Sequence, residues 1–332
     1  MKKNKGKRWL AVAIALLLFV ASSVVSNKSE KIADKEKEQL ADKYFSQFNP
    51  FSASVNRNII EEGDSEGKIA IVSYEGAIGD GQNYETFMDQ LDDVYDDDSI
   101  SGLIMKVNSP GGAVYNSEQI ANKIKKIQED KKVPVFTVME TMAASGGYYI
   151  SAPTDRIYAS NETLTGSIGV IMSSTSFQGL FEKYGIKQQN ITTGKMKDAG
   201  SVGKDMNNEQ KKYFQNLINS SFDRFVEVVS QGRSMKEDEV RKLADGRVYD
   251  GAQAKENGLV DEIGDLESAI DDMKKDYKLN NPQVFEYKDE YEYFSKIFSK
   301  SESLVDKNSS DLAVLKELME KDSPLPMYYY GK

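Results

Sequence analysis

The strongest constraint on the fold is an alternation of short apolar runs with amphipathic segments between residues 68 and 139. The run at 69–72 is continuously apolar, as is typical of a strand buried on both faces. We expect strands at 68–78, 100–107 and 134–139, with helices at 83–96 and 117–129 between them. Strands that alternate with helices pair in parallel through right-handed crossovers, so the sequence predicts an α/β domain.

The pattern continues beyond residue 139 with less regularity. Short strands are expected at 156–159 and 186–193, and helices at 177–184 and 207–231. Ser234 and Glu237 have the spacing of a capping box, and Asp250 can cap a short helix that Gly258 ends. The segment after Pro282 lacks clear strand signals, and we expect it to be partly mobile. The predicted folded domain therefore spans 67–280, between a polar stalk or linker at 26–66 and a carboxyl-terminal segment at 281–332.

The amino terminus has the features of a membrane anchor. Five positive charges in residues 1–8 precede the seventeen uncharged residues 9–25. Such a segment is short but sufficient to span a bilayer, and the preceding charges favour a cytoplasmic amino terminus. We expect a single-pass cell-membrane protein with an extracytoplasmic body. The alternative is a cleaved signal peptide, because Ala21 and Ser23 are the small residues that cleavage prefers.

Two residue types are absent from the whole chain, and their absence excludes several kinds of chemistry. The sequence contains no histidine and no cysteine. A Ser-His-Asp triad, a thiol nucleophile, a disulfide and a zinc finger are therefore excluded. Covalent chemistry must come from Ser, Thr, Lys, Tyr or a carboxylate. The net charge of −10 also argues against sequence-independent binding to nucleic acid.

Two glycine-bearing turns follow predicted strands at their carboxyl ends, where open parallel sheets place ligand sites. They are Asn-Ser-Pro-Gly-Gly at 108–112 and Ala-Ala-Ser-Gly-Gly at 143–147. Ser145 would begin a helix, and the N–H groups of Gly146 and of the glycine pair 111–112 could stabilise an oxyanion beside it. This arrangement suits acyl transfer, although spacing alone favours a tight structural turn at each of the two motifs, because such turns are common.

A nucleophilic serine requires a base, and without histidine the economical candidate is a lysine kept neutral by burial. Such a lysine must lose roughly three pKa units from about 10.4, which costs on the order of 4 kcal/mol. Lys195, Lys197 and Lys204 share a glycine-rich loop after a predicted strand. The residue pattern does not choose among these three lysines.

Several motifs in order carry a resemblance to a known family. They are VNSPGG at 107–112, MAASGGYY at 142–149, TGSIGV at 165–170, KMKD with a following Gly-Ser at 195–201, and GRVY at 246–249. Over about residues 66 to 275 the sequence resembles the signal peptide peptidase A family, peptidase family S49. This family consists of membrane-bound bacterial peptidases. The resemblance also implies the ClpP/crotonase fold with its repeated β-β-α units.

The resemblance also implies a serine endopeptidase with a Ser/Lys catalytic dyad. Ser145 would be the nucleophile and Lys197 the general base, with the N–H groups of Gly112 and Gly146 forming the oxyanion hole. Ser167 would support the dyad by hydrogen bonding the Lys197 amine, although it is equally compatible with a turn serine. No metal and no cofactor are expected.

The expected partners follow from the same resemblance. Substrates would be remnant signal peptides and other apolar peptides, cleaved beside the membrane. Some relatives of double length carry serine and lysine on separate halves, whereas this chain carries both, which implies a homo-oligomer whose neighbours complete one another's active sites. The aromatic tail at 327–330 is either a self-substrate or regulatory segment, or a disordered terminus.

Two rival functions remain at this point. A crotonase-type enzyme would bind acyl-CoA and direct the same oxyanion geometry at a thioester, but the expected extracytoplasmic location argues against a CoA ligand. A non-catalytic membrane scaffold or peptide-binding regulator would keep the fold without the chemistry. The presence of both Ser145 and Lys197 argues against that reading.

Overall fold

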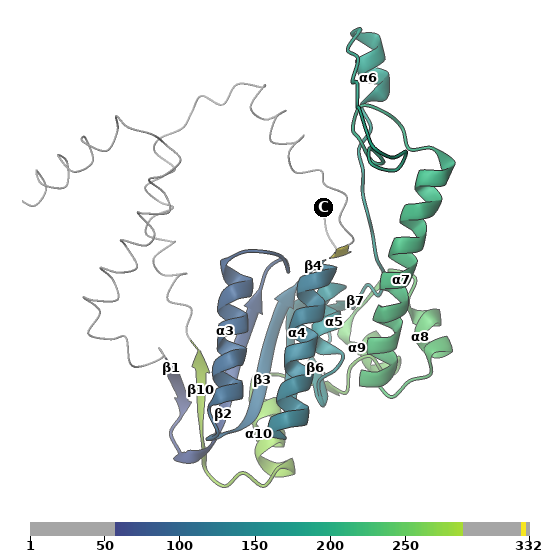
Figure 1. The fold of residues 1–332 in the computed structure, drawn as a ribbon. Helices are drawn as coiled ribbons and strands as arrows, with labels where there is room; N and C mark the ends of the chain where they lie inside the picture. Colours follow the sequence, from purple (N-terminus) through teal and green to yellow (C-terminus); the bar gives the residue numbers. More distant parts are fainter. Residues whose placement is uncertain (1–56, 288–326, 330–332) are drawn as a thin grey trace, which may run out of the picture. The chain divides into compact units, whose positions relative to one another are not determined.

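The computed structural model describes residues 57–287 and 327–329 of the chain (Figure 1). The anchor expected at 9–25 and most of the expected stalk lie outside these residues. Within the described ranges, none of the helices has both the length and the apolar character needed to cross a bilayer.

A largely parallel β-sheet organises the domain. Its strands in space follow the order β1-β10-β2-β3-β5-β6-β9, and all neighbours from β10 to β9 are parallel. β1 joins β10 in antiparallel orientation, while β7 pairs with β5 and with β8. The strands are β1 (Arg57–Glu61), β2 (Asp64–Glu75), β3 (Ile100–Ser109), β5 (Val135–Ala144), β6 (Arg156–Ala159), β7 (Leu164–Gly166), β8 (Val248–Tyr249), β9 (Glu262–Ile263) and β10 (Pro282–Tyr287). The predicted parallel α/β architecture is confirmed.

The helices occupy most of the positions that the sequence predicts. They are α3 (Gln82–Asp96), α4 (Val114–Lys126) continued by the π-helical turn η1 (Ile127–Lys131), α5 (Gly146–Ser151), α6 (Gln178–Lys183), α7 (Asn208–Gly232), α8 (Glu237–Leu243), α9 (Gly251–Glu256) and α10 (Leu266–Asp276). Asn207 caps α7 and Asp250 caps α9, each through a complete capping box. A separate two-stranded sheet joins β4 (Gly111–Ala113) to β11 (Met327–Tyr329).

The central strands are buried on both faces because successive side chains point to opposite sides. Ile69 and Ile71 of β2 belong to a core cluster that includes Met273 of α10. The intervening Ala70 and Val72 belong to a second, larger cluster with side chains from α3, α4, α5 and α7. In Figure 1, α3 and α4 cover one face of the sheet while α10 lies behind it. The continuous apolar run at 69–72 therefore contributes to two cores.

β5 changes partner halfway along its length, and this change prepares the site. Its first half, Val135 to Met139, lies next to β3 and β6. Its last three residues, Met142 to Ala144, pair with β7 instead. The turn at 143–147 thus emerges between β3 and β7, and the chain enters α5 directly afterwards.

The strand expected at 186–193 is wrong. These residues form neither helix nor strand, and Ile186 and Ile191 are exposed, Ile191 completely. The spaced isoleucines imitate a strand pattern, but a strand is stable only when a neighbouring strand satisfies its backbone.

Two further expectations fail where pairing is distant in sequence. β10 forms in the segment thought to lack strand signals, and β1 forms inside the expected linker. β10 lies between β1 and β2, with Phe285 opposite both Ile59 and Ala70. Val284 and Phe285 are buried by this insertion. The two segments become strands because β2 provides an edge on which β10 and then β1 can pair.

Ser234 does not cap the next helix. Its φ of 51° belongs to the turn after α7, and Lys236 stands at the N-cap of α8 instead. The Lys236 N–H donates to Glu239 Oε2, so the reciprocal bond forms two residues later than predicted.

Truncation of a buried leucine should lower the free energy of unfolding more than truncation of an exposed leucine. Leu91→Ala on α3 empties a fully buried position and should lower the free energy of unfolding by about 2–5 kcal/mol. Leu180→Ala on α6 is the matched control, because Leu180 is exposed and the change there should stay within about 0.5 kcal/mol. Urea denaturation followed by circular dichroism measures both. Equal effects would contradict the assigned core.

Candidate active site

Ser145 occupies a strained turn between β5 and α5. Its backbone has φ 54° and ψ −114°, a conformation that residues with side chains rarely adopt and that costs about 1–3 kcal/mol. The residue is 1% exposed, and its carbonyl accepts the first helical hydrogen bond from the Tyr149 N–H at 2.8 Å. Every residue of α5 is buried, so the surrounding packing holds the turn in place.

The Thr-Gly-Ser stretch at 165–167 lies directly beside this turn. The Ser145 N–H donates to the Gly166 carbonyl at 2.8 Å, and Thr165 Oγ1 donates to the Ala143 carbonyl at 2.7 Å. Ser167 is buried, has a positive φ of 49°, and donates its N–H to the Arg247 carbonyl. The structure therefore brings the segments of Ser145 and Ser167 together.

Two glycine contacts fix the backbone in front of Ser145. A Cβ on Gly112 would lie 1.8 Å from the Ile78 carbonyl oxygen. A Cβ on Gly146 would lie 3.0 Å from the Gly112 nitrogen and 2.8 Å from Ser117 Oγ. Backbone therefore packs directly on backbone at both positions, and only glycine leaves room for that approach.

The amide of Gly112 is directed away from Ile78. Ile78 takes its two hydrogen bonds from the neighbours, because its N–H donates to the Gly111 carbonyl and its carbonyl accepts from the Ala113 N–H. Backbone groups of successive residues in an extended strand point to opposite edges. The N–H and carbonyl of Gly112 consequently face the other edge of β4.

That edge of β4 already holds a strand of the same chain. β11 pairs with it in antiparallel orientation, with Met327 opposite Ala113, Tyr328 opposite Gly112 and Tyr329 opposite Gly111. Of the tail at 327–330, Tyr330 lies outside the described residues. The pairing establishes that β4 can accept an extended peptide by strand addition.

The three candidate lysines differ in their ion pairs. Lys195 pairs with Glu209 at 2.5 Å and Lys204 pairs with Asp198 at 2.5 Å. Lys197 is exposed and, among the residues the structure describes, forms neither an ion pair nor a side-chain hydrogen bond. Of these three candidates, Lys197 is thus the lysine whose amine has no partner among the described residues.

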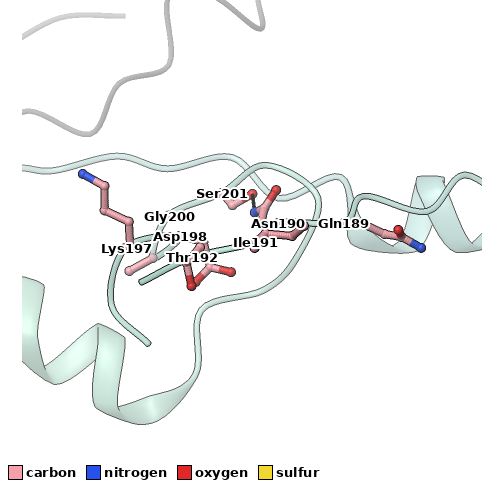
Figure 2. Close-up of a pocket in the computed structure, with 9 residues that line it drawn as sticks. Gln189, Asn190, Ile191, Thr192, Lys197, Asp198, Gly200 and Ser201 are labelled. Carbon is pink, nitrogen blue, oxygen red and sulfur yellow. Dashed lines mark hydrogen bonds between the residues drawn. The ribbon is translucent and has the colours of Figure 1, made fainter. Parts of the chain in front are cut away.

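Lys197 and Asp198 line a polar cleft of about 530 Å³ in the loop between α6 and α7. The cleft is formed by Gln189, Asn190, Ile191, Thr192 and the residues 197–201. Figure 2 shows the Lys197 side chain extending away from Asn190 and Ser201. A hydrogen bond from Lys204 lowers the pKa of the Asp198 carboxyl, and a hydrogen bond with Asn190 acts in the same direction.

The predicted site residues therefore fall into two groups. Ser145, Gly112, Gly146 and Ser167 are gathered around the end of β5. In the part of the chain that the structure describes, no hydrogen bond joins Lys197 to either serine.

Three positioning residues escaped the sequence analysis. Ile78 holds β4 through its backbone, Ser117 packs against Gly146, and Ser109 Oγ accepts the Gly111 N–H at 3.1 Å. Only Ser109 lies in a motif, the Ser-Pro-Gly-Gly turn, that could have drawn attention to it. The backbone of Ile78 and the hydroxyl of Ser117 have no recognisable sequence signal.

The serine cluster has the parts that acyl transfer requires. Ser145 stands on a rigid turn, Gly112 and Gly146 pack closely against each other beside it, and the edge of β4 pairs with peptide backbone. Preorganised N–H groups stabilise the negative charge that develops on a carbonyl oxygen under attack.

The comparisons with known proteins agree with this chemistry. The model of peptidase family S49 matches residues 127–280, and the Clp protease model matches residues 66–165. A protein of Enterococcus faecium assigned as signal peptide peptidase SppA is 39% identical over 98% of this chain and 98% of its own length. Protease 4 of Haemophilus influenzae is 38% identical over 61% of this chain and 34% of its own length. The chloroplast serine protease SPPA of Arabidopsis thaliana is 33% identical over 56% of this chain and 27% of its own length.

A methyl group at position 112 should disturb the site through the backbone. Gly112→Ala forces β4 away from Ile78, so we expect a loss of about 1–3 kcal/mol in the free energy of unfolding. Gly79→Ala, next to Ile78, is the matched control, because nothing lies within 4 Å of the added Cβ. Thermal unfolding compares the two variants. Native stability in Gly112→Ala would disprove the close approach.

Proposed function

The chain belongs to peptidase family S49 and is a serine peptidase, and on that premise we propose that it is a membrane-anchored endopeptidase with a Ser145/Lys197 dyad that degrades remnant signal peptides. The observation that supports the nucleophile most directly is the strained, buried turn of Ser145, beside which Gly112 and Gly146 pack closely together.

In the proposed mechanism, the substrate binds along β4 as an extended strand. The Lys197 amine takes the hydroxyl proton as Ser145 Oγ attacks the scissile carbonyl, and the N–H groups of Gly112 and Gly146 stabilise the oxyanion. Collapse of the tetrahedral intermediate breaks the C–N bond, and the Lys197 ammonium returns the proton to the leaving amine. Water then hydrolyses the acyl-enzyme with the Lys197 amine again acting as base, and Ser145 is regenerated.

The position of Lys197 supports an assembly of several copies. Within the described chain its amine is exposed and lacks a carboxylate partner, whereas Ser145 is buried. We infer that each Ser145 meets the Lys197 of a neighbouring copy in a homo-oligomer. Docking of the loop on that neighbour would remove water from the amine, and desolvation favours the neutral form that a base requires.

The substrate class follows from the strand edge and from the proposed anchor. Main-chain pairing along β4 accepts any extended peptide, and the chain's own strand there reads Met-Tyr-Tyr, an apolar and aromatic segment. An anchor at 9–25 would hold the domain outside the cytoplasm and beside membrane-bound apolar peptides. Occupation of the same edge by the tail also favours the reading of that tail as a self-substrate or regulatory segment.

The dyad and its assembly are tested together by mixing two inactive variants. Ser145→Ala and Lys197→Ala should each lose at least about 1,000-fold in kcat/KM on a fluorogenic apolar peptide. Co-expression of the two at equal levels should restore about a quarter of the native activity. About half of the sites receive an intact Ser145, and about half of those have a neighbour with an intact Lys197.

The outcome of the mixture separates the alternatives. An inactive mixture of correctly assembled variants would place both groups in one chain. Activity in Lys197→Ala alone would transfer the role of base to Lys195 or Lys204. Activity in Ser145→Ala would reject Ser145 as the nucleophile. A native protein that binds apolar peptide without cutting it would favour the non-catalytic scaffold.

Substrate choice is tested with a synthetic signal peptide and a control peptide of the same length in which the apolar residues are replaced by Ser and Gln. We expect kcat/KM to be at least about tenfold higher for the signal peptide, since each lost apolar contact costs about 1–3 kcal/mol. Mass spectrometry of the fragments identifies the cleaved bonds. Equal rates for the two peptides would remove signal peptides as the preferred class.

A further inference from the structure

Two ion pairs flank Lys197 in the loop before α7. Lys195 is paired with Glu209, and Lys204 is paired with Asp198, the residue that directly follows Lys197. The Lys204–Asp198 pair is partly exposed, with 44% and 17% of the two side chains accessible. Ion pairs of this kind contribute little to the free energy of folding. We therefore consider the effect of this pair on the neighbouring charge of Lys197.

The backbone places Lys204 beside Asp198. The Ser201 N–H donates to the Asp198 carbonyl at 3.1 Å, and the Lys204 N–H donates to the Ser201 carbonyl at 3.3 Å. These two successive turns return the chain to Asp198, where Lys204 Nζ donates to Oδ2. The Lys197 side chain extends away from Asn190 and Ser201 in Figure 2.

Asp198 is the carboxylate closest in sequence to the proposed base, Lys197. An anion near an ammonium group stabilises the protonated form, and a protonated lysine cannot accept the serine proton. Lys204 pairs with this carboxylate and donates a hydrogen bond to its Oδ2 atom.

We propose that Lys204 is a positioning residue that keeps the Asp198 carboxylate engaged and thereby leaves Lys197 free to act as the general base. The inference rests on the proposed function, since it assigns a role to the neighbours of that base. Lys204 touches neither substrate nor Ser145 in this account and acts through Asp198.

Two other acidic groups near the loop also have partners. Glu209 at the start of α7 holds Lys195, and Asp205 accepts a hydrogen bond from Ser176. The remaining charged side chains on α6, the loop and the first turn of α7 are Glu182, Lys183, Lys187, Lys211 and Lys212. Loss of Lys204 would therefore release one specific anion, Asp198, next to Lys197.

The test is the pH profile of kcat/KM for the full-length oligomer. Lys204→Gln should move the acid limb upward by about one pH unit, which lowers the rate about tenfold below the limb and leaves it near native at high pH. Lys204→Arg should keep the native profile. Asp198→Asn with Lys204→Gln should restore it, and Asp198→Asn alone should move the limb to lower pH. Lys187→Gln, an exposed lysine of the same segment, controls for the loss of one positive charge.

The possible failures are distinguishable. An unshifted limb in Lys204→Gln, with Lys197→Ala inactive, would overturn this inference alone. A rate loss that is equal at every pH and is not rescued by Asp198→Asn would also overturn it, because that result indicates a structural role. Activity in Lys197→Ala would overturn the proposed function instead.

Discussion

The candidate site depends on one backbone contact, the approach of β4 to Ile78 on one side and to α5 on the other. Gly112 and Gly146 permit this approach, since a single Cβ at either position would overlap backbone or Ser117. The contact sets the direction of the Gly112 amide and holds the Ser145 turn against a buried helix. Strain of about 1–3 kcal/mol at Ser145 is sustained because the complete burial of α5 leaves the turn no relaxed alternative. The fold therefore holds Ser145, the proposed nucleophile, and the two glycines in place.

Sequence patterns identified the elements whose signals are local. The apolar run at 69–72 and the periodic helix at 83–96 contain their own evidence, because burial on both faces or on one stripe dictates the residue types. β1 and β10 do not, since Arg57–Glu61 becomes a strand only by pairing with residues more than two hundred positions away. The reverse error at 186–193 has the same cause: Ile186 and Ile191 have strand-like spacing but no strand to join.

The candidate site was also predictable only where its signals are local. The exclusion of histidine and cysteine directed attention to serine and lysine, and the two glycine turns at the ends of β3 and β5 meet as the strand order requires. The pairing of Lys195 with Glu209 and of Lys204 with Asp198 was not predictable, because it depends on how an irregular loop folds. That pairing distinguishes the three lysines, which the residue pattern could not do.

The proposed enzyme separates its reactive groups by the kind of structure that carries them. Ser145 and its amides are built into the sheet, whereas Lys197 stands on a loop without regular structure. Hydrolysis would then require two events. The loop must dock on a neighbouring copy, and β11 must dissociate from the edge of β4. A single chain with an exposed lysine and an occupied strand edge would be inactive on both counts. Such an arrangement would confine proteolysis to assembled copies beside a peptide that competes successfully for β4.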